Sequence, residues 1–197
     1  MIKFTYKKGS DYMASIYVQN LVKTVIDNSY SNSWDAAVME WDIIDCEEDS
    51  EMQGECICGK ENIKYLYTIK NQLTGKILYP IGSSCIKKFE RARLNDQISI
   101  IEGMFKLYNA ILSNQRIELN SNFFSKKLLF ALYEDGAFVD NCYNSYDGER
   151  DYEFMLELFK KRNKDLITVN QRKKVDAIIL NSIKPYLRRN LKFKRNR

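Results

Sequence analysis

The chain has 197 residues, of which 45% are hydrophobic and 29% charged, values typical of a globular protein with one domain or one core and a small appendage. It contains no histidine, which excludes Ser-His and Cys-His nucleophiles and every histidine-ligated metal site. The net charge of +5 is uneven, because an acidic segment from Glu40 to Glu55 contrasts with a basic end from Lys184 onward.

The sequence predicts a cytoplasmic protein. No stretch approaches the roughly 18 uninterrupted apolar residues of a membrane span. Lys7, Lys8 and Asp11 interrupt the N-terminal segment, which argues against a signal peptide. Disulfides are rare in the cytoplasm, so the cysteines are expected to be metal ligands or core residues. They are Cys46, Cys56, Cys58, Cys85 and Cys142.

The first part of the chain is expected to be helical and then to form an acidic loop. Apolar residues at helical spacing predict an amphipathic helix from about Tyr12 to Asp27. Ser33 can cap a second helix, which begins near Trp34 and ends near Trp41. The acidic stretch that follows, up to Glu55, shows no periodicity and is interpreted as a loop.

A β-hairpin is predicted next. Ile63 to Ile69 has the alternation of a half-buried strand, and Ile77 to Ile81 supplies the return strand. Between them, Asn71 to Lys76 has turn composition, with Gly75 able to take a positive φ. Gly82-Ser83-Ser84 then breaks the strand, and a hydroxyl is available to cap a helix that starts at Cys85.

The rest of the chain is expected to be helical. Periodic apolar residues predict helices over about Asp96 to Ser113, Ser121 to Glu134 and Asp151 to Arg162. Thr168 to Gln171 fits a capping box that opens a last helix, and Pro185 is expected to end or kink that helix.

The cysteine spacing predicts a structural zinc site. Cys56 and Cys58 flank one residue ahead of Gly59, and Cys85 follows the hairpin at a helix start. Thiolates are preferred zinc ligands, and the helix dipole favours the thiolate form of Cys85. A turn-borne cysteine pair followed by a cysteine at a helix N-terminus is the layout of treble-clef and ribbon sites.

A closed structural zinc site needs a fourth ligand. Cys46 is favoured, because it lies ten residues ahead of Cys56, across a segment long enough to form a returning loop. Cys142 and a carboxylate such as Glu55 are the alternatives. The position three residues after Cys85, where a second helix-borne ligand usually lies, is Lys88, whose ammonium group cannot coordinate.

The predicted fold class is therefore α+β and rich in helix. A zinc-bound β-hairpin lies between N-terminal helices and a C-terminal helical bundle. The predicted segments are N-terminal helices over 1–45, a zinc-binding hairpin module over 46–94, a helical region over 95–187 and a basic tail over 188–197.

The zinc cassette also carries a resemblance. Its pattern is Cys-x-Cys-Gly, then Asn-x-x-Thr-Gly, then Ile-Gly-Ser-x-Cys-Ile-x-x-Phe, at Cys56, Cys58, Gly59, Asn71, Thr74, Gly75, Ile81, Gly82, Ser83, Cys85, Ile86 and Phe89. It resembles a family of small zinc-binding proteins of Gram-positive bacteria and their phages and mobile elements. Some phage proteins of this size inhibit host defence, and at least one class of anti-CRISPR protein against Cas9 is a zinc metalloprotein. The resemblance implies zinc binding, and it suggests Cas9 as a target.

The first functional hypothesis is a phage-encoded inhibitor that binds a host effector such as Cas9 and blocks the loading of target DNA. Such effectors hold nucleic acid in a positively charged channel. An acidic surface could occupy that channel, with Trp34 and Trp41 as possible interface anchors. Its candidate residues are Glu40, Asp42, Glu47, Glu48, Asp49 and Glu51.

The alternative hypothesis is a nucleic-acid-binding accessory protein that holds zinc. Cations could neutralise phosphates, and Tyr65 and Tyr67 beside Lys64 could stack on bases. The cationic candidates are Lys87, Lys88, Arg91, Arg93, Arg188 and Arg189.

An enzyme is the least favoured hypothesis. Asp42, Asp45 and Asp49 could hold a magnesium ion for a nuclease, but their spacing matches no recognisable motif. The chain is therefore expected to be non-catalytic.

Overall fold

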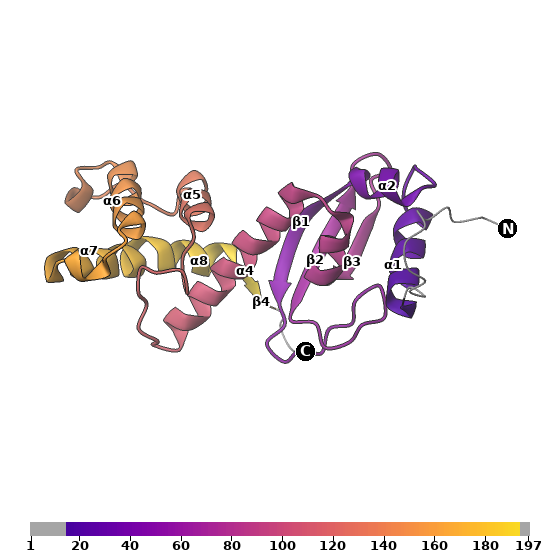
Figure 1. Cartoon of the computed structure of the whole chain (residues 1–197), viewed down its shortest axis with the longest axis horizontal. Coiled ribbons are helices and arrows are strands. Elements are labelled where there is room, and N and C mark those ends of the chain that lie inside the picture. Colours follow the sequence, from indigo (N-terminus) through magenta and orange to yellow (C-terminus); the bar gives the residue numbers. More distant parts are fainter. Residues whose placement is uncertain (1–14, 194–197) are drawn as a thin grey trace.

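A computed structural model describes residues 15–193, which form an elongated molecule with a sheet lobe and a helical lobe (Figure 1). The predicted α+β class is confirmed. The helices are α1 Ile16–Asp27, α2 Trp34–Ala37, α3 Ser83–Ile86, α4 Ala92–Leu112, α5 Lys126–Glu134, α6 Gly148–Lys160, α7 Val169–Ile178 and α8 Lys184–Asn190. The strands are β1 Trp41–Glu48, β2 Tyr65–Asn71, β3 Ile77–Ile81 and β4 Lys192–Phe193, in the sheet order β3-β2-β1-β4.

The predicted hairpin is confirmed as β2 and β3, which pair antiparallel. The side chain of Asn71 closes its turn by accepting hydrogen bonds from the backbone N–H groups of Leu73 and Thr74, both at 2.8 Å. Gly75 takes the expected positive φ, +72°. The Asn-x-x-Thr-Gly part of the cassette therefore has a local structural explanation.

The prediction of a loop over the acidic segment is wrong for its first part and holds for residues 49–55, which lie outside the named helices and strands. Trp41–Glu48 is β1, which pairs antiparallel with β2 and parallel with β4. A bulge between Ile43 and Asp45 shifts the register, so the apolar residues of the strand no longer follow a simple alternation. That shift explains why the strand is hard to recognise in the sequence. The helix before it is also shorter than predicted, because the chain passes through a 3-10 turn at Val38–Glu40 into β1.

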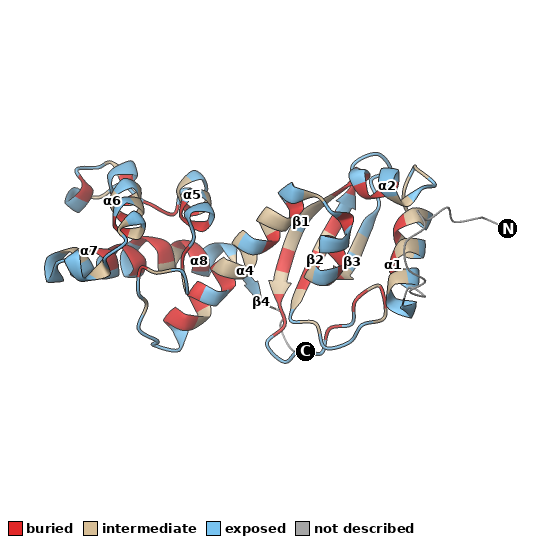
Figure 2. Cartoon of the chain, viewed as in Figure 1, coloured by how far each residue is buried: buried red, intermediate tan, exposed pale blue. Residues whose placement is uncertain are grey.

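Two hydrophobic clusters form the core, and α4 contributes to both. Leu94, Ile98 and Phe105 of α4 pack with the sheet and with α1, whereas Leu107 and Ile111 pack with the helical lobe. Buried positions occur along the length of α4 (Figure 2). The helix therefore joins the lobes by contributing buried residues to both clusters.

The last described residues return to the sheet. Glu47 and Glu48 of β1 pair with Lys192 and Phe193 of β4. The ring of Phe193 contacts the ring of Phe105, with centroids 5.4 Å apart. Arg188 and Arg189, expected in a tail, belong to α8.

The remaining helices follow the sequence with small differences. α1 ends at Asp27 as predicted, and residues 12–14 of the predicted helix lie outside the described residues. Ser33 makes no side-chain cap for α2, and Gly82 rather than a serine is the N-cap of α3. α5 begins at Lys126, where the Ser125 side chain accepts a hydrogen bond from the N–H of Leu128.

In the last helix the predicted capping box is confirmed, whereas the predicted helix end at Pro185 is not found. Thr168 and Gln171 form the predicted capping box of α7. Pro185 does not end the helix, because a π-helical turn at Ile179–Ile183 connects α7 to α8, and Pro185 lies in the first turn of α8. A wider turn can accommodate the missing N–H of a proline. Among the described residues, no helix combines the length and apolarity that crossing a membrane requires.

Candidate metal centre

A tight turn brings Cys56 and Cys58 to the sheet lobe's edge. The N–H of Gly59 donates to the carbonyl of Cys56 at 2.7 Å, and Gly59 takes a φ of +89°, which a glycine adopts at little cost. The N–H of Ile57 donates to the carbonyl of Pro80 at 2.9 Å and so ties the turn to β3. On the other side, the amide of Asn20 in α1 donates to the carbonyl of Cys58 at 3.1 Å.

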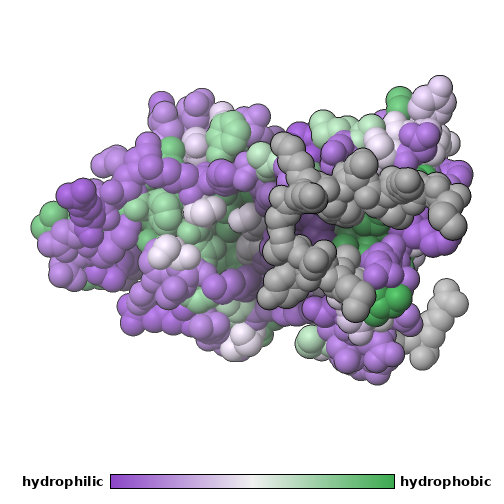
Figure 3. Space-filling model, turned by 45° about the vertical axis from the view of Figure 1, so that its right-hand side comes forward, coloured by the Kyte–Doolittle hydropathy of each residue, from purple (hydrophilic) through white to green (hydrophobic). Residues whose placement is uncertain are grey.

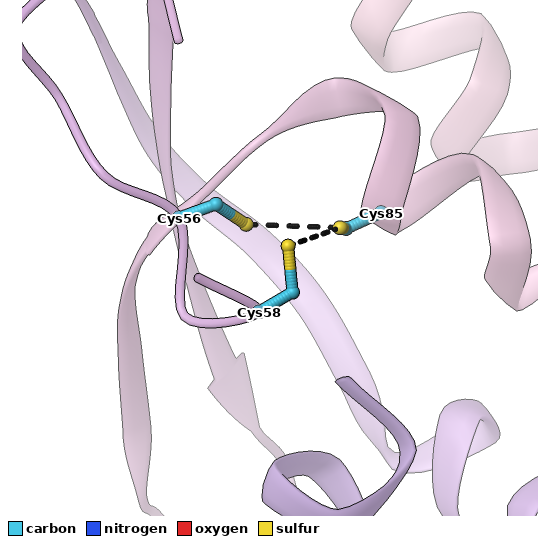
Figure 4. Close-up of side chains that lie close together, drawn as sticks. All are labelled: Cys56, Cys58 and Cys85. Carbon is cyan, nitrogen blue, oxygen red and sulfur yellow. Dashed lines mark hydrogen bonds between the residues drawn. The ribbon is translucent and has the colours of Figure 1, made fainter. Parts of the chain in front are cut away.

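Cys85 completes a cluster of three thiols. It lies in α3 directly after β3, and its sulfur points at both sulfurs of the turn (Figure 4). The Cys85 Sγ is 3.6 Å from the Cys56 Sγ and 3.5 Å from the Cys58 Sγ, and all three cysteines are free thiols. The exposed fraction is 7% for Cys85, 3% for Cys56 and 1% for Cys58.

These distances fit a tetrahedral zinc site. With Zn–S bonds of about 2.3 Å, two thiolates at a tetrahedral angle lie about 3.8 Å apart. The observed sulfur–sulfur distances are within a few tenths of an ångström of that value. They are much longer than the roughly 2.05 Å of a disulfide. Cys56, Cys58 and Cys85 are therefore placed to bind one metal ion, as the sequence predicts.

The surroundings favour a thiolate at Cys56. The hydrogen bond from the Cys85 thiol lowers the pKa of Cys56, and although burial opposes this, the backbone N–H groups of Cys58 and Gly82 lower it further. The Gly82 nitrogen is 3.3 Å from the Cys56 sulfur. Backbone N–H donors around a thiolate are typical of the outer shell of a metal site, where they orient the ligand.

Cys46 does not join the cluster. It lies on β1 opposite Tyr67, and its thiol donates to the backbone carbonyl of Glu47 at 3.8 Å. Burial among apolar residues raises the pKa of this thiol, which favours the protonated form rather than a metal-binding thiolate. The arrangement therefore does not support the prediction that Cys46 is the fourth ligand.

The other predicted alternatives are also outside the cluster. Cys142 is exposed in the helical lobe, in a 3-10 turn, and Glu55 is exposed beside the cysteine turn. Among the described residues, no aspartate or glutamate lies with the three sulfurs in the arrangement of a fourth ligand. The three thiols are thus the only protein ligands that this arrangement brings together within the described part of the chain.

Replacing Cys46 by serine tests this assignment. We expect Cys46→Ser to keep the wild-type metal content, because its sulfur is not with the other three. We also expect a loss of about 1–2 kcal/mol in the free energy of unfolding, because a hydroxyl is more costly to bury than a thiol. Metal analysis and urea unfolding measure the two effects. A drop in metal content would restore Cys46 as a ligand.

The acidic candidates do not form one surface. Glu40, Glu48 and Asp49 are buried, with exposed fractions of 6%, 1% and 1%, which corrects their prediction as partner-binding residues. Glu48 is held by Lys64, 2.8 Å away, and by the amide of Asn109.

The other acidic candidates lie nearer the surface. Asp42 is ion-paired with Arg91 and Arg93, and Glu47 accepts a hydrogen bond from the hydroxyl of Tyr79. Glu51 is exposed. Most of these carboxylates therefore stabilise the fold through contacts inside the protein, which the sequence did not reveal.

The anchor and stacking candidates are mostly internal. Trp41 and Tyr67 are fully buried, whereas Trp34 and Tyr65 are half-buried. The Trp34 ring contacts that of Phe89. The tyrosine side chains of β2 therefore belong to the core face of the sheet, and the sheet does not present them as a base-stacking platform.

Some of the cationic candidates are bound to groups within the fold, and others are exposed at the surface. The Arg91 guanidinium donates to the backbone carbonyls of Val38 and Trp41 and to the Asp42 carboxylate, so its role is structural. Lys87 and Lys88, in the 3-10 turn Lys87–Phe89 after α3, are exposed, and so are Arg188 and Arg189 at the end of α8.

The sequence pointed to the cysteines but not to the groups that support them. Asn20 lies 38 residues from Cys58, and nothing in its local sequence marks it as a partner of the turn. The N–H of Gly82 is a backbone donor, and the residue types in a sequence do not show where backbone donors point. The resemblance to small zinc proteins of Gram-positive bacteria and phages rests on the residues of the cassette. No protein-family model, curated protein or solved structure matches this chain.

Proposed function

We propose that this chain is a non-catalytic binding protein whose sheet lobe is stabilised by one structural zinc ion. The observation that carries the proposal is the convergence of three buried thiols, 3.5 and 3.6 Å apart, from a backbone turn and a helix start. Zinc is the ion that a set of thiolates in tetrahedral spacing favours. When bound, it would link the cysteine turn, β3 and α3 into a module of treble-clef type.

Three thiolates leave one coordination position to another donor. The chain has no histidine, and its two remaining cysteines lie elsewhere in the fold. We therefore propose a fourth ligand that is neither thiolate nor imidazole, such as a carboxylate or a water molecule. The residues of this chain hold the metal and bury its ligands.

Metal analysis of the purified full chain tests the proposal. We expect about one zinc ion per chain after purification without added metal. Substitution with Co²⁺ should give a thiolate-to-cobalt charge-transfer band whose intensity corresponds to three thiolates rather than four. A metal-free protein with unchanged stability would contradict a structural role for zinc.

The more specific prediction, an inhibitor of Cas9, remains a prediction about the target. Its acidic candidates need revision, because Glu40, Glu48 and Asp49 are buried. A Cas9 cleavage assay with an excess of the purified protein tests it. Inhibition that disappears when DNA is loaded before the protein would indicate that the loading step is blocked. Full cleavage at every ratio would exclude that effector as the target.

A further inference from the structure

The two halves of the described chain, divided at the start of α4, carry opposite charge. Residues 15–91 contain 8 lysines and arginines against 12 aspartates and glutamates, a net charge of −4. Residues 92–193 contain 17 against 13, a net charge of +4. The two charges cancel in the sum over the described residues. The positive charge of the second half can attract an anionic partner to that part of the molecule.

The charge is concentrated on the helix that runs from α7 through the π turn to α8. Residues 169–190 contain six cations, Arg172, Lys173, Lys174, Lys184, Arg188 and Arg189, and one carboxylate, Asp176. At about 1.5 Å per residue this helix is roughly 33 Å long. No other continuous helix among the described residues has such an imbalance.

Two of the six cations have structural partners. Arg172 donates to the backbone carbonyls of Ile167 and Lys164, and Lys174 forms an ion pair with Asp151. The other four, Lys173, Lys184, Arg188 and Arg189, form no ion pair among the described residues. Three of these are exposed and Lys184 is half-buried. We call these four side chains the basic face.

The other side of the same helix is committed to the core. Its buried residues recur at helical spacing and are Val175, Ile178, Ile179, Ser182, Ile183, Tyr186 and Leu187. An amphipathic helix that binds a bilayer must insert its apolar side, and here most of that side packs in the core, while Val169 and Leu180 are exposed. The part of the helical lobe seen in Figure 3 is mostly hydrophilic at its outer end. A polar polyanion fits this helix better than a membrane does.

A protein partner fits less well for a different reason. Protein interfaces depend on buried aromatic or arginine anchors, and lysine is depleted at their centres. The basic face offers flexible, unpaired cations spread over about 24 Å of helix, from Lys173 to Arg189. Exposed cations without ion pairs can contact the phosphates of a nucleic-acid backbone, which need no shaped pocket.

We propose that the basic face binds the phosphate backbone of a nucleic acid without reading its sequence. Contacts of this kind gain free energy mainly from the release of counterions, so they need charge and reach rather than shaped pockets. This function goes beyond the proposed zinc-stabilised fold and does not depend on the identity of the metal. DNA and RNA share the chemistry that is recognised.

The test is a titration of the full chain against fluorescent 20-mers of duplex DNA, duplex RNA and single-stranded DNA between 50 and 300 mM salt. The test variant is Lys173→Gln/Lys184→Gln/Arg188→Gln/Arg189→Gln. A matched control, Lys70→Gln/Lys76→Gln/Lys87→Gln/Lys88→Gln, removes the same charge from exposed positions of the sheet lobe and includes two cations predicted from the sequence.

We expect wild-type binding whose log K falls steeply with log salt. The test variant should bind at least about 100-fold more weakly at 50 mM salt and lose about 3–4 units of slope on a duplex. The control should keep most of the affinity. Arg188→Gln alone should lose about one unit of slope, which separates a local contact from a folding defect. The relative strength on the three probes identifies the preferred nucleic acid.

Several outcomes would overturn the proposal. One is the absence of binding to all three probes at 50 mM salt. Another is an equal loss in the test and control variants, which would indicate an effect of net charge alone. A third is binding to phosphatidylserine vesicles without binding to any nucleic acid. Zinc content, measured on the same samples, separates these results from a failure of the metal proposal.

Discussion

Replacing Cys85 by serine is expected to release the metal and to destabilise the protein by more than about 4 kcal/mol. Removal of a structural metal is among the few single changes that cost this much. Cys85 is the sulfur that contacts both others, so its loss leaves two thiols of the turn with no partner from α3. We expect Cys58→Ser to have the same effect. Metal analysis and thermal unfolding measure the two consequences.

The matched control is Cys142→Ser. Cys142 is exposed in a 3-10 turn of the helical lobe, far along the chain from the cluster. Its replacement should change neither the zinc content nor the unfolding temperature. If Cys142→Ser loses the metal, or if Cys85→Ser keeps it, the assignment of the three ligands is incorrect.

Replacing Glu40 by glutamine is expected to cost about 3 kcal/mol, because it leaves a buried donor facing another donor. The Glu40 carboxylate accepts hydrogen bonds from the backbone N–H groups of Tyr30 and Ser31, both at 2.8 Å. It also accepts one from the amide of Asn71 at 2.7 Å. Three donors thus converge on one carboxylate. The amide nitrogen of glutamine would replace one acceptor with a donor. Urea unfolding of both proteins at pH 7 measures the difference.

The same carboxylate gives the stability a pH dependence. Burial alone would raise the pKa of Glu40, but the hydrogen bonds from Asn71, Tyr30 and Ser31 outweigh it and lower the pKa from 4.5 to about 2. A lowered pKa adds stability that is fully present above pH 4.5 and is lost as the pH falls towards 2. The stability difference between wild type and Glu40→Gln should therefore shrink across that range.

Glu61→Gln is the control for Glu40, since Glu61 is exposed and lies in the same lobe. Its stability should follow that of the wild type within about 0.5 kcal/mol. A difference between wild type and Glu40→Gln that stays constant from pH 5 to pH 2 would show that folding does not lower the pKa of the Glu40 carboxyl.

The sequence predicted the hairpin and the cysteine turn well because both are local. The Asn71-to-Gly75 turn forms within a few residues, and Cys56, Cys58 and Gly59 belong to a single turn. Local hydrogen bonds and a positive φ are encoded by residue type. The capping box of Thr168 and Gln171 is predictable for the same reason.

The failures concern contacts that are distant in the sequence. The acidic strand β1 can be recognised only when the partners of its own charged residues are known. Glu48 is paired with Lys64 and Asn109, and Asp42 with Arg91. A charged residue without visible partners looks like a surface residue, and a bulge conceals the strand periodicity. The same limit affects Cys46, whose thiol belongs to the sheet core.

The position of α4 has a consequence for how the molecule comes apart. One side of its first half closes the core over the sheet, and its second half closes the core of the helical lobe. Unfolding of this 21-residue helix would therefore open both cores. The helix thus couples melting of the two halves into a single cooperative event. Through it, a metal bound near α1 would raise the temperature at which the distant end of the protein unfolds.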